Sequence, residues 1–214
     1  MARGKWGVAV LFVIAITLRI VNGSTQLAPA DELYHWKRMK FSAQHFPEVL
    51  ELDGDRGVAG AFCPWPPLYD LSGGGVARIF GAGTVVWIPP IAGAACVALA
   101  ALWIASNFGT LAGITAGLAL AASPFIVTQS SLGDIDHHFL EWPLAFAIMV
   151  ATARRRPAIP LALAMLAAMF VQTALLIACA LAFAVVFATK KHAAGAFLAT
   201  AVAITVYRLT RAPA

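Results

Sequence analysis

Residues 84–105 read TVVWIPPIAGAACVALAALWIA, an apolar stretch without a charged side chain. A transmembrane α-helix needs about 20 predominantly apolar residues to cross about 30 Å of hydrocarbon, so this stretch is long enough to span a bilayer. Of the 214 residues, 61% are hydrophobic and 12% are charged, against roughly 25% charged in soluble domains. The sequence therefore predicts an all-α polytopic membrane protein, because helices satisfy their own backbone groups in lipid.

Other apolar stretches predict the remaining spans, at about 6–22, 109–127, 139–153 and 193–207. The run at 158–188 is long for one helix and short for two, so we expect about six or seven transmembrane helices. The first stretch can also be read as a cleaved signal peptide. Arg19 near its end and the lack of a small-residue cleavage site after it favour a retained helix.

Basic clusters set the expected orientation. Arg3 and Lys5 precede the first span and Arg154–Arg156 follow the fourth, and such clusters stay cytoplasmic. The first loop, about 23–83, and the motif at about 128–141 are then external, and they hold all 10 acidic residues. We therefore expect any chemistry on the external face of a prokaryotic inner (cytoplasmic) membrane. The basic residues lie at helix ends and do not indicate a nucleic-acid partner.

The first external loop begins with a segment that combines acids with a histidine. It reads DELYHWKR, residues 31–38, in which Asp31 and His35 are spaced to share one face of a helix. Such a pair suits a divalent cation or the phosphate that accompanies it. A solvated stretch with Tyr34 and Trp36 as interfacial anchors fits the same residues equally well.

The external turn SLGDIDHHFLE, residues 131–141, gathers acids and histidines close to the hydrocarbon. Ionisable groups there are unfavourable and are a functional hypothesis by default, the alternative being a hydrated turn that caps the next helix. Carboxylates with an imidazole suit Mg²⁺ or Mn²⁺ better than a tetrahedral zinc site. A third segment, PWPPLYD at 64–70, predicts a rigid aromatic rim or an ordinary proline-rich connector.

In this order the segments resemble the oligosaccharyltransferase catalytic-subunit family, membrane glycosyltransferases of the GT-C class. The resemblance is carried by Arg19 near the end of the first helix, Asp31-x-x-Tyr34-His35, Trp65-Pro66-Pro67-Leu68, and Asp136-His137-His138-x-x-Glu141. It covers essentially the whole chain but only the front part of a family member. Residues 1–214 are therefore expected to form a single transmembrane GT-C-like domain without the family's soluble C-terminal domain.

The resemblance implies transfer of a glycan from a polyprenyl-diphosphate donor to the side chain of Asn in an acceptor protein or peptide. Carried over residue by residue, it implies a Mg²⁺ or Mn²⁺ ion held by Asp31, Asp136 and His138, with Asp31 and Asp136 as catalytic residues. The adjacent His137 is expected to point elsewhere on a helical turn. The expected substrate-binding residues are Tyr34, His35, Lys37, Arg38, Trp65, His137 and Glu141.

Two features depart from the family pattern. Gln129 stands where many members carry an arginine, and no acidic residue follows Glu141. It stays open whether the chain is active alone, and a separate soluble domain or subunit is an expected partner besides membrane lipid. Two alternative functions also stay open. One is a GT-C transferase that uses a polyprenyl-monophosphate sugar, which the Asp31-Glu32 pair also fits, and the other is a non-catalytic accessory or transport protein with an external cation site.

Overall fold

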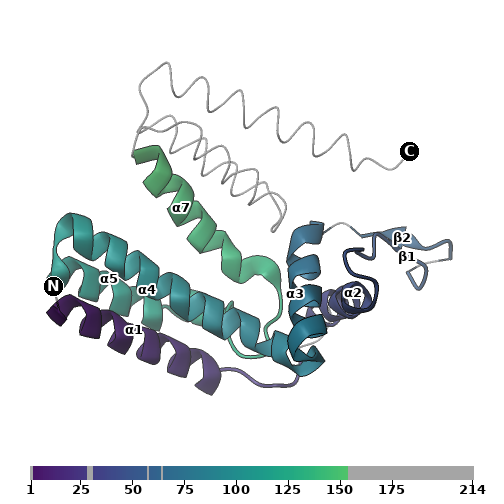
Figure 1. Ribbon diagram of the computed structural model, residues 1–214, viewed down its shortest axis with the longest axis horizontal. Helices are drawn as coiled ribbons and strands as arrows, with labels where there is room; N and C mark the ends of the chain where they lie inside the picture. The colour runs from purple at the N-terminus through teal and green to yellow at the C-terminus, as the bar shows by residue number, and fades with distance from the viewer. Residues whose placement is uncertain (1, 28–30, 57, 64, 154–214) are drawn as a thin grey trace, which may run out of the picture. The chain divides into compact units, whose positions relative to one another are not determined.

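A computed structural model describes residues 2–27, 31–56, 58–63 and 65–153 (Figure 1). The predicted spans at 158–188 and 193–207, and the basic cluster Arg154–Arg156, lie outside the described residues. The described chain divides into two compact units. The first runs to Glu48 and resumes from Asp70 to Phe139, and the second takes in Val49–Tyr69 and continues from Leu140.

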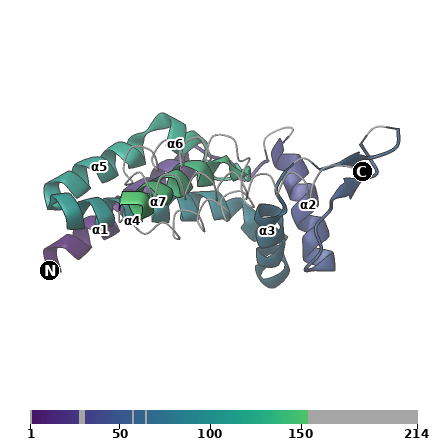
Figure 2. The ribbon, with the colours of Figure 1, turned by 90° about the horizontal axis from the view of Figure 1, so that it is seen from above.

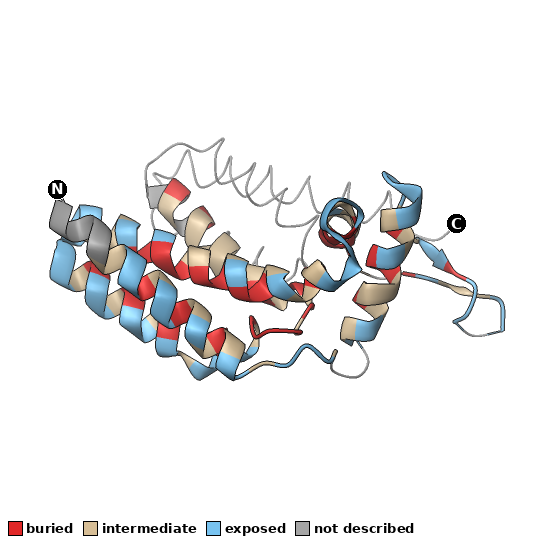
Figure 3. Cartoon of the chain, turned by 60° about the horizontal axis from the view of Figure 1, so that its bottom comes forward, coloured by how far each residue is buried: buried red, intermediate tan, exposed pale blue. Residues whose placement is uncertain are grey.

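Three helices of the first unit pack side by side: α1 (Ala2–Val21), α4 (Ile88–Phe108) and α5 (Thr110–Ala122) (Figures 1 and 2). A short 3-10 helix, η1 (Ala82–Trp87), leads into α4, whose first turn carries a proline. Proline is tolerated there because the first helical N–H groups have no partner within the helix. The buried residues of this bundle lie on the sides where the helices face one another (Figure 3).

Glycines on α5 allow the close approach of these helices. A Cβ atom at Gly113 would lie 2.4 Å from the Ala105 Cβ on α4, and one at Gly117 would lie 2.7 Å from Leu11 Cδ1 on α1. Small residues repeated at this spacing are typical of helix contacts within membranes, where backbone approach replaces the hydrophobic effect. Leu11, at the second of these contacts, is buried.

Among the described residues, one continuous helical stretch, Ala82–Phe108, is long and apolar enough to cross a membrane. It includes the stretch 84–105. Two further apolar helices are shorter, Gly7–Val21 and Thr110–Ala122. The predicted span 109–127 is interrupted, because α5 ends at Ala122 and Pro124 begins a separate short helix, α6 (Pro124–Thr128). The helical class is confirmed, and the number of spans stays a prediction.

The expected first loop, 23–83, contains two helices, α2 (Asp31–His45) and α3 (Pro67–Phe80). Acidic residues occupy the first turn of each helix, where they interact favourably with the helix dipole. Pro67 begins α3, a position that suits its fixed φ angle. The predicted external loop therefore contains two helices, which hold two of its charged stretches, and its position outside the membrane stays a prediction.

The second unit contains a small antiparallel ladder and a helix. Strand β1 (Leu52–Asp53) pairs with β2 (Ala61–Phe62) in the register Leu52 to Phe62. The carboxylate of the buried Asp53 accepts a hydrogen bond of 3.0 Å from the Asp55 backbone N–H and so closes the turn. Helix α7 (Glu141–Ala153) corresponds to the predicted span 139–153. Within the described residues, the all-α expectation holds apart from this two-stranded ladder.

Candidate metal centre

Three segments of the first unit bring acidic and imidazole side chains together. His35 lies on α2, Asp70 lies in the first turn of α3, and Asp136 precedes η2 (His137–Leu140), a 3-10 helix that begins with His137. His35, Asp70 and His137 are buried, and the Asp136 side chain is 14% exposed. Residues from distant parts of the sequence therefore share one site.

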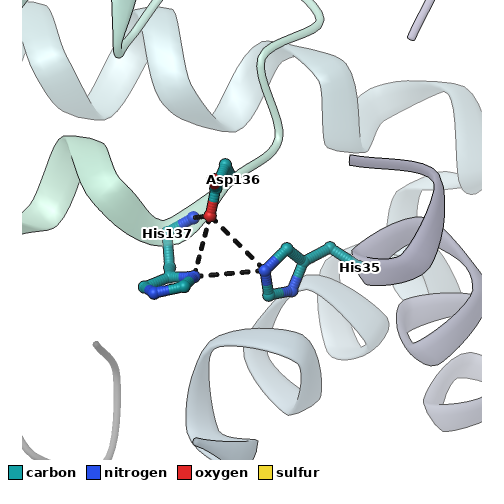
Figure 4. A group of neighbouring side chains, drawn as sticks. All are labelled: His35, Asp136 and His137. Atoms are coloured by element: carbon teal, nitrogen blue, oxygen red, sulfur yellow. Dashed lines mark hydrogen bonds and ion pairs between the residues drawn. The ribbon is translucent and has the colours of Figure 1, made fainter. Parts of the chain in front are cut away.

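The side chains of His35, Asp136 and His137 meet at a point (Figure 4). Asp136 Oδ1 lies 2.8 Å from His137 Nδ1 and 3.4 Å from His35 Nε2, and the two ring nitrogens are 3.1 Å apart. The His137 backbone N–H also donates to Asp136 Oδ1 at 2.6 Å. We call the three side chains the inner cluster. Among the described residues, they form the one group of three potential metal ligands whose atoms all lie within 4.8 Å of one another.

A buried ion pair between Asp70 and Arg38 contacts His35 of the inner cluster. His35 Nδ1 lies 2.6 Å from Asp70 Oδ1, and the other Asp70 oxygen pairs with the Arg38 guanidinium, one turn after His35 on α2. Asp70 and Arg38 are both fully buried. Since a carboxylate oxygen accepts hydrogen bonds, His35 Nδ1–H donates to Asp70, and Nε2 is left facing Asp136 and His137.

The pKa values of His35 and Asp136 are shifted in opposite directions in this cluster. Burial alone would lower the pKa of His35, but hydrogen bonds to Asp136 and Asp70 and the charges of both carboxylates raise this pKa to about 9. Burial alone would raise the pKa of Asp136, but hydrogen bonds from His137 and His35 and the charges of His137 and His138 hold it well below its usual range. In the metal-free protein, His35 is therefore an imidazolium near neutral pH, and Asp136 is a carboxylate.

These shifts predict how the stability of the metal-free protein depends on pH. The pKa of His35 is raised from 6.5 to about 9 on folding, so its contribution to stability is full below pH 6.5 and is lost as the pH rises through 9. The melting midpoint is measured in detergent with a chelator at pH 7 and at pH 9.5. The midpoint of the wild type should fall over this range, and that of His35→Gln should fall by several degrees less. His45→Gln, on the exposed end of α2, should behave like the wild type. Equal falls in the wild type and His35→Gln would contradict the shift.

The turn that carries Asp136 is hydrogen-bonded to the end of α1 and to η1, where the Val86 carbonyl accepts a 3.2 Å hydrogen bond from the Gly133 N–H. The Leu132 backbone N–H donates to the Arg19 carbonyl at 3.1 Å, and the Ser24 N–H donates to the Leu132 carbonyl at 2.8 Å. The buried Arg19 side chain adds a 2.7 Å hydrogen bond from Nε to Ser130 Oγ. Because α1 is itself packed in the helix bundle, these bonds fix the position from which Asp136 reaches the cluster.

Gly133 is the tightest point of this turn. Its φ is +88°, a conformation that favours glycine, and an added Cβ would lie 2.0 Å from the Ser24 carbonyl oxygen. We expect Gly133→Ala to lower the unfolding free energy by about 1–3 kcal/mol. The matched control is Gly83→Ala, where an added Cβ meets no atom within 4 Å, and its melting midpoint should change little. Equal midpoints for the two variants would contradict this account of the turn.

The second oxygen of Asp136 faces a different set of side chains. Asp136 Oδ2 lies 3.4 Å from Nε2 of His138, whose side chain is 40% exposed. Burial and then repulsion from Glu32 and Asp136 raise the pKa of the nearby Asp134 to about 6, so negative charge is concentrated here. We call this region the outer side of Asp136. It contains Asp136 and His138 of the predicted metal ligands.

The third predicted ligand, Asp31, is the exposed first residue of α2 and does not belong to the inner cluster. The expectation that His137 points elsewhere was wrong. Residue 137 begins a 3-10 helix rather than continuing an α-helical turn, and its ring nitrogen contacts the Asp136 carboxylate. The rings of His137 and His138 lie 4.6 Å apart and both contact Asp136.

The predicted substrate-binding residues belong to both units. Tyr34 and Lys37 are partly exposed on α2, whereas Arg38 is buried against Asp70. Trp65 and Glu141 belong to the second unit, where the Arg56 guanidinium lies 5.7 Å from the centre of the Trp65 ring. Asp70 is the residue that sequence reasoning missed. Its position in the proline-rich segment 64–70 gave no signal that it would meet His35.

The fold and the inner cluster together define a helical protein with a candidate divalent-cation centre. No family model and no curated protein matches the chain, but solved structures do. The archaeal oligosaccharyltransferase AglB from Archaeoglobus fulgidus, in complex with an inhibitory peptide and a dolichol-phosphate, matches with a TM-score of 0.69 and 16% identity over 97% of this chain and 33% of that chain.

Two further structures of the Archaeoglobus fulgidus oligosaccharyltransferase give the same result. The apo form matches with a TM-score of 0.68 and 17% identity over 97% of this chain and 33% of that chain. A complex with Zn and sulfate matches with a TM-score of 0.67 and 16% identity over 96% of this chain and 35% of that chain. The chain therefore spans about a third of the length of these proteins. The resemblance drawn from the motifs is confirmed at the level of the fold.

Proposed function

We propose that this protein is a membrane glycosyltransferase of the oligosaccharyltransferase type. It would transfer a glycan from a polyprenyl-diphosphate donor to the Asn side chain of an acceptor protein or peptide. The observation that carries the proposal is the position of the Asp136 carboxylate, which lies between histidines on a hydrogen-bonded turn. The fold that holds this turn is similar to that of an oligosaccharyltransferase. The similar structures include complexes with a dolichol-phosphate and with an acceptor peptide, which supports a polyprenyl-linked donor and a peptide acceptor without distinguishing a diphosphate from a monophosphate.

We assign the divalent cation of the proposed function to the outer side of Asp136 because of the family resemblance. Its donors would be Asp136 and His138, which are in contact, and Asp31, as the family resemblance implies. A set with two carboxylates and one imidazole suits Mg²⁺ or Mn²⁺, and the charge of Glu32 and Asp134 adds to the attraction for a cation. When bound, such an ion supplies neutralisation of the charge that develops on a leaving diphosphate.

The protein's own residues would bind and orient the two substrates. Asp31 and Asp136 are the proposed catalytic carboxylates, and a carboxylate that accepts a hydrogen bond from the acceptor amide orients its nitrogen. Lys37, partly exposed on α2, is the proposed contact of the donor diphosphate. Arg38 is paired with buried Asp70, so its role here is to hold Asp70 and His35 rather than to reach the donor. Tyr34, Trp65 and Glu141 remain proposed substrate contacts.

The chemical test uses the full chain in proteoliposomes with a polyprenyl-diphosphate oligosaccharide and a peptide that contains Asn-x-Thr. We expect glycopeptide to form with Mn²⁺ and not with a chelator. Consumption of a polyprenyl-monophosphate sugar in place of the diphosphate would favour the alternative GT-C transferase. Turnover of neither donor, before and after a soluble partner subunit is added, would favour a non-catalytic accessory or transport protein.

The proposal also requires a membrane orientation. The N-terminus and Arg154–Arg156 would be cytoplasmic, with Asp31 and Asp134 external, because basic clusters resist translocation. Asp55→Cys, in a background without Cys63, Cys96 and Cys179, should react with an impermeant maleimide added to intact cells or to spheroplasts. The side chain of Asp55 is exposed, so access within the protein does not limit the reaction. Labelling only after the cytoplasmic side is opened would contradict the topology.

A further inference from the structure

The Asp136 carboxylate faces two different donor sets with its two oxygens. Oδ1 belongs to the inner cluster, with His35 Nε2 and His137 Nδ1, and Oδ2 faces His138 on the outer side. A carboxylate placed in this way can bind one cation with each oxygen, as in two-metal sites with ions about 3.5–4 Å apart. The outer cation of the proposed function uses only one of these two positions.

The three atoms of the inner cluster have the spacing of ligands to one ion. Their separations are 2.8, 3.1 and 3.4 Å. Zinc binds imidazole nitrogen and carboxylate oxygen at about 2.0–2.2 Å, so neighbouring ligands of one ion lie about 3–3.5 Å apart. An ion at the centre would therefore replace the contacts among these atoms with little movement of the side chains.

The inner cluster also has the supporting contacts of a built site. His35 and His137 are each 1% exposed. Asp70 accepts a 2.6 Å hydrogen bond from His35 Nδ1–H, so that His35 directs Nε2 at the centre, and Arg38 holds Asp70 in turn. A carboxylate that orients a histidine in this way commonly accompanies protein metal sites, where it fixes the ring and its tautomer.

We propose that the inner cluster is a second cation position, which shares Asp136 with the outer one and selects a transition metal such as Zn²⁺ over Mg²⁺. Two imidazoles with one carboxylate favour Zn²⁺ and its neighbours, whereas the oxygen-rich outer side favours Mg²⁺ or Mn²⁺. The inner ion ties α2 to the turn before η2, and so holds the Asp136 carboxylate in place for the outer ion. Only the outer position rests on the proposed function; the inner position stands on its own geometry.

The test is metal stoichiometry on the full chain, purified in detergent, stripped with a chelator and dialysed against Zn²⁺ and then Mn²⁺. Elemental analysis should find about one zinc per chain that resists exchange by excess Mg²⁺. His35→Ala and His137→Ala should lose this zinc and still bind Mn²⁺. His138→Ala should keep the zinc and weaken Mn²⁺ binding, and Asp136→Ala should weaken both. His45→Ala, an exposed histidine on the same helix, is the matched control.

Two further measurements keep the proposal testable if a histidine variant fails to fold. Asp70→Asn, which keeps the side-chain size, should weaken zinc binding by about 10–100-fold. X-ray absorption at the zinc edge of the wild-type protein should show imidazole ligands. Zinc without imidazole scattering, wild-type zinc affinity in His35→Ala, or no tight zinc at all would overturn the inner position. Tight zinc without Mn²⁺ binding would instead contradict the outer cation, and with it the proposed function.

Discussion

Asp136→Ala is expected to abolish Mn²⁺-dependent glycan transfer and to weaken Mn²⁺ binding by roughly 100-fold or more, since removing even a residue behind a ligand commonly lowers affinity 10–100-fold. Both oxygens of this carboxylate contact histidines. Mn²⁺ titration followed by electron paramagnetic resonance measures the affinity directly, and glycopeptide formation measures the transfer.

The controls for Asp136 separate a local effect from a general one. Asp31→Ala and His138→Ala should also weaken Mn²⁺ binding. Glu51→Ala should not, although Glu51 is an exposed acid in the same predicted external loop as Asp31. The melting midpoint of each variant shows whether the fold is intact. Unchanged Mn²⁺ affinity in both Asp136→Ala and His138→Ala would remove the outer site.

The largest expected effect on stability is that of Asp70→Ala. The change takes a fully buried carboxylate away from Arg38, which is also fully buried, and away from His35. Breaking a buried pair by removing one partner typically lowers the unfolding free energy by about 3–5 kcal/mol, because the remaining charge stays in a low-dielectric environment. Thermal or denaturant unfolding in detergent checks this value.

Glu48→Ala is the matched control for Asp70→Ala. Glu48 is an exposed acid of the same unit, and surface substitutions usually change stability by no more than about 0.5 kcal/mol. If Asp70→Ala were as stable as Glu48→Ala, the buried pair would have no structural role. The orientation of His35 would then need another explanation.

The helical fold could be predicted from the sequence because it follows from local composition. The stretch 84–105 is apolar throughout and lies within a continuous helical stretch, Ala82–Phe108. The break after Ala122 was missed because Pro124 falls within an otherwise apolar run, so hydropathy alone continued the span. Helix α3 was missed because three consecutive glycines, residues 73–75, lower its helix propensity, whereas the spacing of Asp31 and His35 did indicate a helix at the start of α2.

Within the candidate site, the sequence identified the residues of the turn but not their directions. Asp136 and His138 were chosen from the family motif and are in contact. The position of His137 depends on a 3-10 turn, in which side-chain directions differ from those of an α-helix. Asp70 could not be found at all, because its contact with His35 joins separate helices and leaves no periodic signal in the sequence.

The most direct test of the central claim is Mn²⁺-dependent binding of a polyprenyl diphosphate to the detergent-purified chain. The account predicts that the diphosphate binds more tightly than the matching monophosphate, that Mn²⁺ strengthens its binding, and that Asp136→Ala removes this strengthening. Equal affinity for the diphosphate with and without Mn²⁺, together with equal affinity for the monophosphate, would contradict it.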